Sequence, residues 1–516
     1  MFRLFIAIFL MFSGYGFSNE NYFEFIDTLQ TRDPEASDEN NPLVDLNGMP
    51  DSMVGGCVNA ITGSYSESTT DIYIPSSNPL FVNRYYNSNN KDYGTLMHGW
   101  DLNLRGGAAV SCSDPYRTAF AKYGPSFVTF EGRSYLYRFK FLNKQLRYGV
   151  TNCVSGMLSA KNNIKNLRFY GDPGKSNFCE LYQSSYEKLL FRKYEIDWQN
   201  NHYYHLFQQY FPNGCHYEYN YSKKNVLNKI SSLGSTGDNL GELNFIWQEK
   251  FEKNPIISIK TSQGDTITYK FQKMQTKSNG TYRYCLKELD TPLAPKQTFE
   301  YKFVDKKFPE KIVKSTLPDG RGRHIEYYEK NNYSINGDEI KISKTSDSRF
   351  GRVFALKLPI GLDATPLPMY RFIYHLNKDK ASSKPIGGMT EVYDPYDNKM
   401  AYHFCDEQRL TKIESFNKDG SLYRSENITW GSKKSDEYTL LKNRQICDSN
   451  GNILLAKEYK YDKKGNVIEE KTSGNLKGLG TYETHTKYYS YTIANQISLK
   501  MTVFNKSQVL IIPIQI

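Results

Sequence analysis

The sequence predicts an all-β protein, built as an array of β-hairpins that together form a curved or spiral sheet. Three observations predict this class. A well-formed hairpin sequence near the C-terminus recurs in weaker copies along the chain, aromatic residues make up 15% of the 516 residues, and helical periodicity is scarce. Aromatic residues suit pleated surfaces, whereas Gly, Asn and Asp suit tight turns. Together these features favour strands joined by short turns.

The best-preserved hairpin contains two alternating tyrosines, a turn and the start of a second strand. Tyr459 and Tyr461 fall on one face of an extended segment. Asp462 suits the first position of a type I turn, and Gly465, three residues later, can take the left-handed conformation. Val467 then begins the second strand. The unit is an aromatic, a turn former, Gly or Asn three residues later, and an apolar residue.

The same spacing recurs elsewhere in the chain. It is found at residues 221–227, at 416–422 and at 447–453, the last without its leading aromatic. Weaker relatives occur at 317–320, at 393–398 and at 402–410, where Cys405 and Gln408 replace the expected Asp and Gly. Recurrence of one supersecondary unit predicts a repeat array, in which each hairpin buries its apolar face against its neighbours.

Strands between the clear repeats are predicted from alternation. In residues 266–271, Ile267, Tyr269 and Phe271 share one face while the intervening polar residues share the other. This is the pattern of a half-buried strand. Residues 105–390 are therefore predicted to be degenerate hairpin repeats, and residues 391–475 clearer ones.

A second stretch, residues 55–104, contains four motifs in one order. They are the turn Thr62-Gly63, Asp71 before a strand, the strand end Arg84-Tyr85-Tyr86-Asn87-Ser88, and the pair Gly99-Trp100. This order, with the repeats, resembles the opening block of the Rhs/YD-repeat family, which includes polymorphic bacterial toxins, the C components of insecticidal toxin complexes and the teneurins. The resemblance covers roughly residues 55 to 475. It implies a partial Rhs-like shell.

In toxin-bearing members of that family the repeats form a hollow shell that ends in an Asp-Pro-x-Gly motif, where self-cleavage frees an enclosed C-terminal toxin. Here Asp172-Pro173-Gly174 has its Gly one place too early, and the other Asp-Pro pairs have no Gly at the required position; they are Asp33-Pro34, Asp114-Pro115 and Asp394-Pro395. Only 36 residues follow Gly480. We therefore expect neither self-cleavage nor a C-terminal toxin domain, and we interpret residues 476–516 as a tail.

The N-terminus reads as a cleavable signal peptide over residues 1–18. Arg3 supplies the positive region, residues 4–12 are apolar, and Gly16-Phe17-Ser18 offers small residues before the cleavage site. The nine apolar residues are too few to span a bilayer, which needs about 20. We expect a secreted, periplasmic or cell-surface protein with no transmembrane span in the mature chain. Residues 19–54, acidic and proline-bearing, are predicted to be a flexible arm.

The cysteine count and the net charge bear on possible disulfides and binding partners. Eight cysteines would meet an oxidising compartment if the signal is used, and they permit four disulfides with 105 connectivities. The formal charge of +11 becomes +10 once Arg3 is removed, because 65 basic and 55 acidic residues remain. This favours loose association with anionic surfaces. Lys and Arg are dispersed, so no specific nucleic-acid binding is predicted; the densest groups, 306–314 and 321–324, are interpreted as solvated edges.

The search for chemistry predicts no catalytic, cofactor-binding or metal site. Gly174-Lys175-Ser176 lacks the first Gly of a phosphate-binding loop, because Phe169 stands there. Cys215-His216 and His403-x-Cys405 are interpreted as ordinary strand residues. His202 and His205 are three apart, a spacing that converges on a helix but diverges on a strand, and the Tyr-rich context favours the strand.

The leading hypothesis is a secreted or cell-surface structural and interaction protein, a YD-repeat shell without its own catalysis and without cofactors. One alternative is a truncated shell component of a polymorphic toxin system that encloses a separately encoded effector. Another is a carbohydrate-binding or carbohydrate-hydrolysing protein. The candidate partners are accordingly a protein effector or a cell-surface carbohydrate.

Overall fold

The fold is known from a computed structural model, in which strands dominate the described residues. These are residues 50–89, 93–94, 96–103, 109–112, 126–130, 133–137, 156–157, 168–170, 177–182, 188–196, 202–223, 226–248, 256–275, 282–292, 294–303, 310–317, 319–362, 364–378, 385–405, 408–432, 440–462, 467–476, 482–491, 497–504 and 508–513. Within them, the helical structure is one short 3-10 turn, Pro50–Ser52. The predicted all-β class is confirmed. The predicted signal peptide and most of the arm lie outside these residues.

A long antiparallel sheet forms most of the molecule, and each strand pairs with the next along the chain. Its first half comprises β11 (Gly156–Met157), β12 (Arg168–Tyr170), β13 (Phe178–Tyr182), β14 (Lys188–Ile196), β15 (His202–Tyr210), β16 (His216–Tyr221), β17 (Leu227–Leu233), β18 (Asn239–Trp247), β19 (Ile256–Thr261), β20 (Thr266–Gln275), β21 (Tyr282–Thr291), β22 (Ala294–Phe303), β23 (Glu310–Thr316) and β24 (Gly322–Tyr327). Consecutive antiparallel pairing is what a chain of hairpins produces.

The second half continues in the same way after a small hairpin. That hairpin, β25 (Asn332–Ile335) and β26 (Asp338–Lys341), pairs only within itself among the described strands. The sheet then runs through β27 (Val353–Leu358), β28 (Leu367–Lys378), β29 (Pro385–Tyr393), β30 (Lys399–Phe404), β31 (Leu410–Phe416), β32 (Leu422–Trp430), β33 (Leu441–Asp448), β34 (Ile453–Tyr461), β35 (Val467–Gly474), β36 (Glu483–Tyr491), β37 (Ile497–Phe504) and β38 (Gln508–Pro513).

The sheet forks at β15. Its C-terminal half pairs with β16, while its N-terminal half pairs with β8 (Ala109–Cys112). β8 pairs in turn with β9 (Ser126–Phe130), and β9 with β10 (Arg133–Tyr137). One strand thus carries two branches on the same edge.

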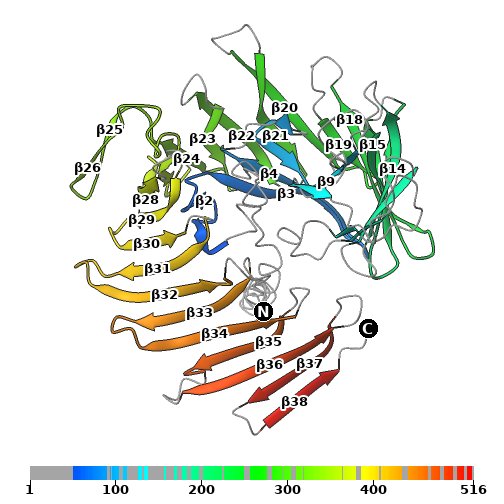
Figure 1. Ribbon diagram of the computed structural model, residues 1–516. Helices are drawn as coiled ribbons and strands as arrows, with labels where there is room; N and C mark the ends of the chain where they lie inside the picture. The colour runs from blue at the N-terminus through cyan, green and yellow to red at the C-terminus, as the bar shows by residue number, and fades with distance from the viewer. Residues whose placement is uncertain are drawn as a thin grey trace, which may run out of the picture.

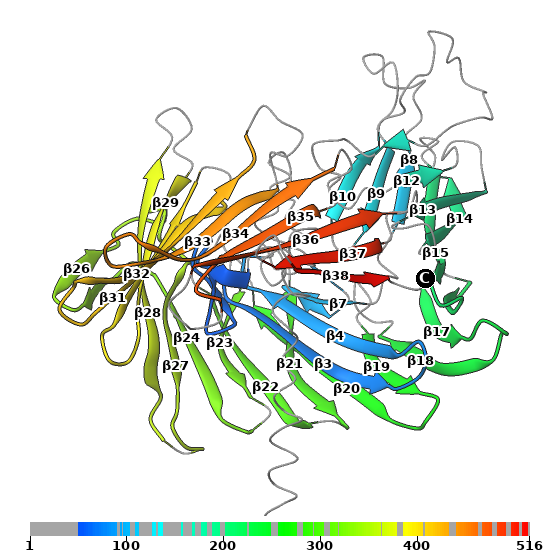
Figure 2. The same ribbon diagram turned by 90° about the horizontal axis from the view of Figure 1, so that it is seen from below.

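Figures 1 and 2 show that the sheet curls, so that it has an inner and an outer face. The N-terminal block, residues 51–103, lies inside this curl against the inner face. It contains β1 (Met53–Val54), β2 (Val58–Asn59), β3 (Ser66–Ile74), β4 (Leu80–Asn87), β5 (Tyr93–Gly94), β6 (Met97–His98) and β7 (Trp100–Leu102). β3, β4 and β7 form a three-stranded sheet of their own. The predicted curved array is confirmed, with this block as its lining.

The predicted turns have the expected geometry wherever the structure describes them. Gly420 and Gly451 take φ of 84°, and each donates its N–H to the carbonyl three residues earlier. The substitutes behave alike, since Gln408 takes φ of 56° and donates to Cys405, while Asp397 takes φ of 66° and donates to Asp394. The turn residues 463–466 of the best-preserved hairpin lie outside the described residues. The repeat is therefore a backbone geometry that several side chains can satisfy.

Three further turns repeat this geometry without the expected sequence. Gly214, Gly237 and Gly264 have positive φ, and each donates to the carbonyl three residues before it. Their turns begin at Phe211, Gly234 and Thr261 rather than at Asp. The signal that identifies them is the glycine alone, because only the left-handed position constrains the residue type.

An aromatic residue at the end of four strands closes the open end of its hairpin. The side chain of each donates a hydrogen bond to the carbonyl of the residue that begins the preceding strand. The pairs are Trp247 with Leu227, Trp430 with Leu410, Tyr461 with Leu441, and Tyr491 with Val467. The N···O distance from Trp430 to Leu410 is 2.7 Å, and the O···O distance from Tyr491 to Val467 is 2.6 Å. Antiparallel pairing places these two strand ends side by side.

Removing one such hydrogen bond should have a small but measurable cost. Tyr461→Phe keeps the ring and leaves the Leu441 carbonyl without this donor, so we expect a loss of about 1 kcal/mol of unfolding free energy. Chemical denaturation would measure it. Tyr423, which is 63% exposed, is the matched control, and Tyr423→Phe should leave stability unchanged. Equal effects of the two changes would contradict the role of the hydroxyl.

The segment 476–516 differs from the expected tail. β36 pairs with β35, β37 with β36 and β38 with β37, so the sheet continues to Pro513. Polar residues dominate β36 (Glu-Thr-His-Thr-Lys-Tyr-Tyr-Ser-Tyr), which hides the alternation of a half-buried strand. Its Tyr489 is nevertheless buried, and Tyr491 closes the hairpin as described above.

Candidate functional site: a buried polar cluster beneath the N-terminal block

The motifs of the N-terminal block converge on one buried cluster. Arg84 on β4 and Asp71 on β3 come together because these two strands pair antiparallel. Both side chains are almost completely buried, at 0% and 1% exposure. A register irregularity between Thr70 and Ile72 places Asp71 at a bulge, a device that often re-aims one side chain of a strand.

Arg84 is held from several sides. Its Nε donates to both carboxylate oxygens of Asp71, at 3.2 and 3.1 Å, and its Nη2 donates to Gln297 Oε1 of β22 at 2.9 Å. Glu67 Oε1 lies 3.7 Å from Nη1. The guanidinium carbon lies 4.7 Å from the ring centroid of Trp100 and 5.2 Å from that of Phe299. A buried cation is thus surrounded by carboxylates, an amide and aromatic faces.

The two carboxylates are also bound to the long sheet. Tyr269 on β20 donates its hydroxyl to Asp71 Oδ2 at 3.2 Å. Glu67 Oε2 accepts from Ser315 of β23 at 2.8 Å and from Tyr65 at 2.6 Å. The Tyr65 hydroxyl in turn accepts from Arg323 Nη1 of β24 at 3.2 Å. With Gln297 of β22, the network therefore joins the block to four strands of the sheet, β20, β22, β23 and β24.

Burial controls the ionisation of this cluster. Burial works to lower the pKa of Arg84, but the carboxylates of Asp71 and Glu67 outweigh it and the pKa rises above its usual value. Burial raises the pKa of Asp71, and the guanidinium of Arg84 opposes that rise. Burial also raises the pKa of Tyr65 and Tyr269 well above 10, so both hydroxyls remain donors.

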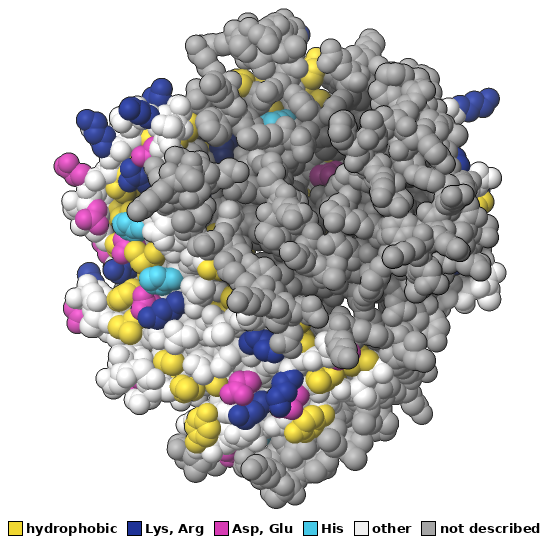
Figure 3. Space-filling model, viewed as in Figure 1, with side chains coloured by type: hydrophobic (Ala, Val, Ile, Leu, Met, Phe, Trp, Pro, Cys, Tyr) yellow, Lys and Arg dark blue, Asp and Glu magenta, His cyan; other side chains and the backbone are white. Residues whose placement is uncertain are grey.

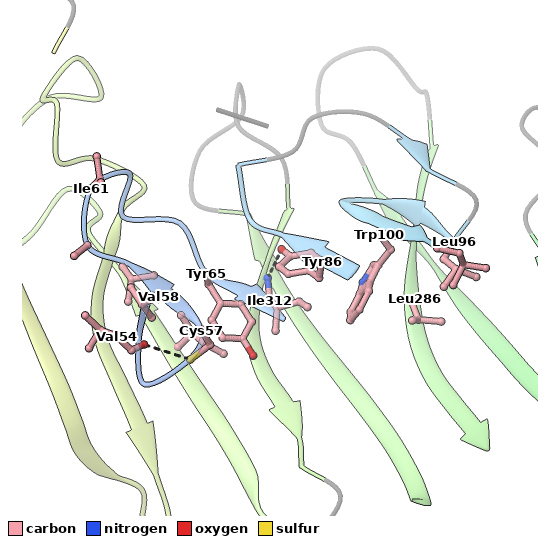
Figure 4. Close-up of a cluster of buried hydrophobic side chains, with 14 of the residues drawn as sticks. Val54, Cys57, Val58, Ile61, Tyr65, Tyr86, Leu96, Trp100, Leu286 and Ile312 are labelled. Atoms are coloured by element: carbon pink, nitrogen blue, oxygen red, sulfur yellow. Dashed lines mark hydrogen bonds between the residues drawn. The ribbon is translucent and has the colours of Figure 1, made fainter. Parts of the chain in front are cut away.

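Aromatic rings cover the cluster and anchor the block. Trp100 lies at centroid distances of 4.9 Å from both Tyr86, tilted by 47°, and Phe299, edge-on, and its Nε1 donates to the Tyr301 hydroxyl at 2.8 Å. Figure 4 shows Tyr65, Tyr86 and Trp100 in a row, with the Tyr86 hydroxyl accepting from the Ile312 N–H at 3.1 Å. These rings connect the block to strands more than 200 residues away.

The Thr62-Gly63 turn meets the sheet at close range. Gly63 has φ of 67°, and a Cβ placed there would lie 2.5 Å from Arg352 Cβ. Its carbonyl accepts from the Val353 N–H at 2.8 Å, so the turn pairs with the start of β27. Only glycine suits both the left-handed backbone and this approach.

Other contacts fasten the block along the sheet. Thr390 Oγ1 of β29 donates to the Ala60 carbonyl, and Arg444 Nη1 of β33 donates to Asp51 Oδ2 at 3.0 Å. Lys311 Nζ of β23 donates to Asn89 Oδ1 at 3.0 Å. The block thus contacts strands from β16, whose Tyr217 donates to the Pro79 carbonyl, to β33.

Two basic groups predicted to be solvated edges are partly buried instead. Lys311 is 2% exposed, and Arg323 binds Tyr65 within the cluster. Arg321 keeps the predicted exposed character and pairs with Asp319. The error has one physical cause: strand periodicity points alternate residues to opposite faces, and one face here is covered by the N-terminal block.

The residues singled out as ligand candidates are not brought together. His216 begins β16 and His403 lies on β30, each beside a glutamate, Glu218 and Glu414. His202 and His205 both lie on β15, as the strand interpretation requires. Across the described part of the chain, no group of three or more His, Cys, Asp and Glu side chains is arranged to hold a metal ion. Asp172-Pro173-Gly174 lies outside the described residues, and Asp394 begins a turn.

The four disulfides that eight cysteines permit are not formed. The six cysteines whose side chains are described are thiols; they are Cys57, Cys179, Cys215, Cys285, Cys405 and Cys447. Most of them are buried, and burial raises the pKa of Cys57 to about 11. The cysteine count could not decide between disulfides and thiols, because thiols serve equally well as small apolar side chains in a core.

Charged side chains on the outer face form pairs rather than a stripe. Figure 3 shows basic and acidic groups interspersed on the side where Figure 1 places β26 to β34. Glu391 of β29 lies 3.2 Å from His375 Nε2 and 3.2 Å from Lys399 Nζ. The hydrogen bond from His375 holds the pKa of the Glu391 carboxyl at about 2, well below its usual 4.5.

This pKa predicts a pH-dependent contribution to stability. Because the folded value lies below the unfolded one, the carboxylate stabilises the fold above about pH 4.5, and the contribution is lost as the pH falls towards 2. We expect wild type to exceed Glu391→Gln by about 1 kcal/mol at neutral pH, a discounted figure for a partly solvated pair. The difference should vanish near pH 2 in denaturation curves. A stability difference between the two proteins that does not change with pH would contradict this prediction.

Comparisons with known proteins give a limited result. Residues 55–110 match the family model described as Domain of unknown function (DUF6531). This range contains all four motifs of the opening block. No curated protein matches the chain.

Solved structures resemble the chain weakly. The chain is 10% identical to a chain of the Photorhabdus luminescens Tc holotoxin pore, with a TM-score of 0.27 over 87% of this chain. It is also 10% identical to chains of the TcdB2–TccC3–Cdc42 complex, with a TM-score of 0.25 over 88%, and of TcdB2–TccC3, with 0.26 over 86%. The chain spans 26% of the length of each of these.

The cluster can hold the N-terminal block in place against the long sheet. Its charges are buried and already bound to one another, so a substrate would have to displace the block to reach them. Two residues of the cluster could be singled out from the sequence, because Asp71 and Arg84 belong to the motifs of the opening block. Gln297, Ser315 and Tyr269 have no local signature and were missed.

Proposed function

We propose that the protein is a secreted or cell-surface structural shell of the Rhs-like kind, which presents an interaction surface and performs no chemistry of its own. The observation that supports this most is the Arg84 cluster. The most elaborate polar arrangement among the described residues is buried and serves to hold a curved sheet around its lining. Such an arrangement favours a fixed shape over an accessible reaction centre.

Imaging tests the proposal. Residues 19–516 should form single curved particles in electron microscopy and small-angle scattering, and disruption of the cluster by Arg84→Met should broaden or open them. Separate compact lobes, or particles unchanged by that substitution, would contradict a shell held by this cluster. A hydrolysis assay on a glycan panel addresses catalysis directly, and turnover abolished by a single carboxylate substitution would overturn the non-enzymatic part.

One observation favours the second candidate, a shell component that encloses a separately encoded effector. The inner face beyond the block carries charged side chains: Lys457, Glu470 and Lys487 share the face of Tyr459, and Glu470 lies 3.6 and 3.9 Å from the two lysines. A charged inner face suits a polar polypeptide more than a dry apolar core. Co-expression with the neighbouring open reading frame, followed by protease digestion, should then leave that product protected.

A further inference from the structure

The outer face of β13, β14 and β15 carries a platform of aromatic rings around one arginine. Cross-strand pairing places Phe178 beside Arg192, and Arg192 beside His205. Tyr194 lies at a register irregularity between Lys193 and Glu195, and its ring lies 6.4 Å from the ring of Tyr203 on the same face. Glu195 pairs with Tyr203 and is exposed at the edge of the platform. The three strands lie side by side at the right of Figure 2. The platform lies on a different part of the sheet from the buried cluster described above.

Two rings of the platform, those of Phe178 and Tyr194, face solvent. Phe178 is 46% exposed and Tyr194 is 37% exposed, whereas the alternate residues Leu181, Leu189 and Phe191 are completely buried. The apolar core of this part of the sheet is therefore already filled from the inner face. Exposed rings grouped on one surface commonly mark a binding site.

Arg192 is the exposed cation of this surface. Its guanidinium carbon lies 4.0 Å from the ring centroid of Phe207 and 5.6 Å from that of Phe178, and no carboxylate pairs with it among the described residues. The neighbouring Lys188 differs, since its Nζ lies 3.5 Å from Glu180 Oε1. Rings hold the arginine in place and leave its donors available for an anion.

Stacking also holds the adjacent ring in a fixed orientation. His205 lies between Tyr194 and Tyr221, at centroid distances of 4.7 and 3.7 Å and with the rings within 7° of parallel. Burial, with the charge of Arg192, lowers the pKa of His205 to about 4, so it is neutral at physiological pH. Arg192 is then the cation of the platform, and one face of the Tyr194 ring stacks on His205.

We propose that this platform binds an acidic polysaccharide of the uronic-acid type, with sugar rings lying on Tyr194 and Phe178 and a sugar carboxylate on the guanidinium of Arg192. Sugar rings present flat apolar C–H faces that suit an aromatic ring, and a carboxylate matches the planar donors of arginine. A nucleic acid fits less well, because tracking a phosphate backbone requires several available cations and this surface offers one. The inference adds a binding site to the structural role.

Titration calorimetry with polygalacturonate oligosaccharides tests the site on residues 19–516. Two further titrants separate the sources of binding: the fully methyl-esterified oligosaccharide keeps the rings and lacks the charge, and oligothymidylate offers phosphates and bases. Saturable binding of the acid form, with the ester at least tenfold weaker, supports the proposal. Binding of the ester equal to that of the acid, binding of oligothymidylate alone, or no binding of the acid would each overturn it.

Variants locate the site. Arg192→Gln, Phe178→Ala and Tyr194→Ala should each weaken binding of the acid form by about tenfold. Tyr423→Ala, a change at a more exposed ring on β32, should leave it unchanged. Circular dichroism and thermal midpoints confirm that the variants are folded, which is expected because the three side chains face solvent. Binding that survives all three substitutions would place the sugar elsewhere and overturn the assignment.

Discussion

Replacing Arg84 by methionine is expected to destabilise the protein strongly, by about 3 to 5 kcal/mol. Methionine fills much of the volume between Trp100 and Phe299 but leaves the carboxylates of Asp71 and Glu67 buried without their cation. Gln297 would lose its donor as well. Since these groups join the block to β20, β22 and β23, the loss should loosen the curvature as well as lower the thermal midpoint.

Two comparisons make this result specific. Arg321→Met removes an arginine that pairs with Asp319 at the surface, and it should leave the thermal midpoint unchanged. The double variant Asp71→Asn with Arg84→Met should be more stable than Arg84→Met alone, because the stranded charge is removed. If Arg84→Met proves as mild as Arg321→Met, the cluster does not hold the block in place.

Gly63→Ala is expected to have the second largest effect, about 3 kcal/mol or more. An alanine at φ of 67° costs about 1 kcal/mol for the left-handed backbone, and its Cβ would in addition lie 2.5 Å from Arg352 Cβ. Relief requires the Thr62-Gly63 turn to move away from β27, which breaks its hydrogen bond to Val353. The free energy of unfolding and the protease sensitivity of the block would both report this.

Gly420→Ala is the matched control. Gly420 also has positive φ, 84°, but nothing lies within 4 Å of a Cβ placed there. Its cost should be the backbone term alone, about 1 kcal/mol. A similar cost at the two glycines would show that the close approach to Arg352 relaxes freely, contrary to a tightly packed junction.

The hairpins could be predicted because their information is local. An aromatic before the turn, a residue that tolerates positive φ and an apolar residue after it all lie within seven positions, and even the substitutes Cys405 and Gln408 were placed correctly. Turns such as the one at Gly264 were missed because their first residues, Phe211, Gly234 and Thr261, are not the Asp, Asn or Ser that usually begin such a turn. The closing role of Tyr461 could have been inferred from its recurrence, but its acceptor, Leu441, lies 20 residues away.

The buried cluster could be predicted only in part. Asp71 and Arg84 are 13 residues apart and meet through one hairpin, so a paired-strand argument reaches them. Gln297, Tyr269 and Ser315 join from 198 to 248 residues away in sequence, where no local pattern points to a partner. The burial of Lys311 and Arg323 was missed for the same reason, since their strands look solvated until the block covers them.

The amino-acid order alone therefore specifies an all-β chain of hairpins and an opening block of four motifs, because turn geometry and strand alternation depend on neighbours a few residues apart. Which face of the sheet is covered, which charges are buried and how far the curl extends depend on the packing of the block against strands hundreds of residues later. That packing decides which side chains lose their water: Arg84 is buried at the centre of the polar cluster, whereas Arg192 stays exposed among its rings.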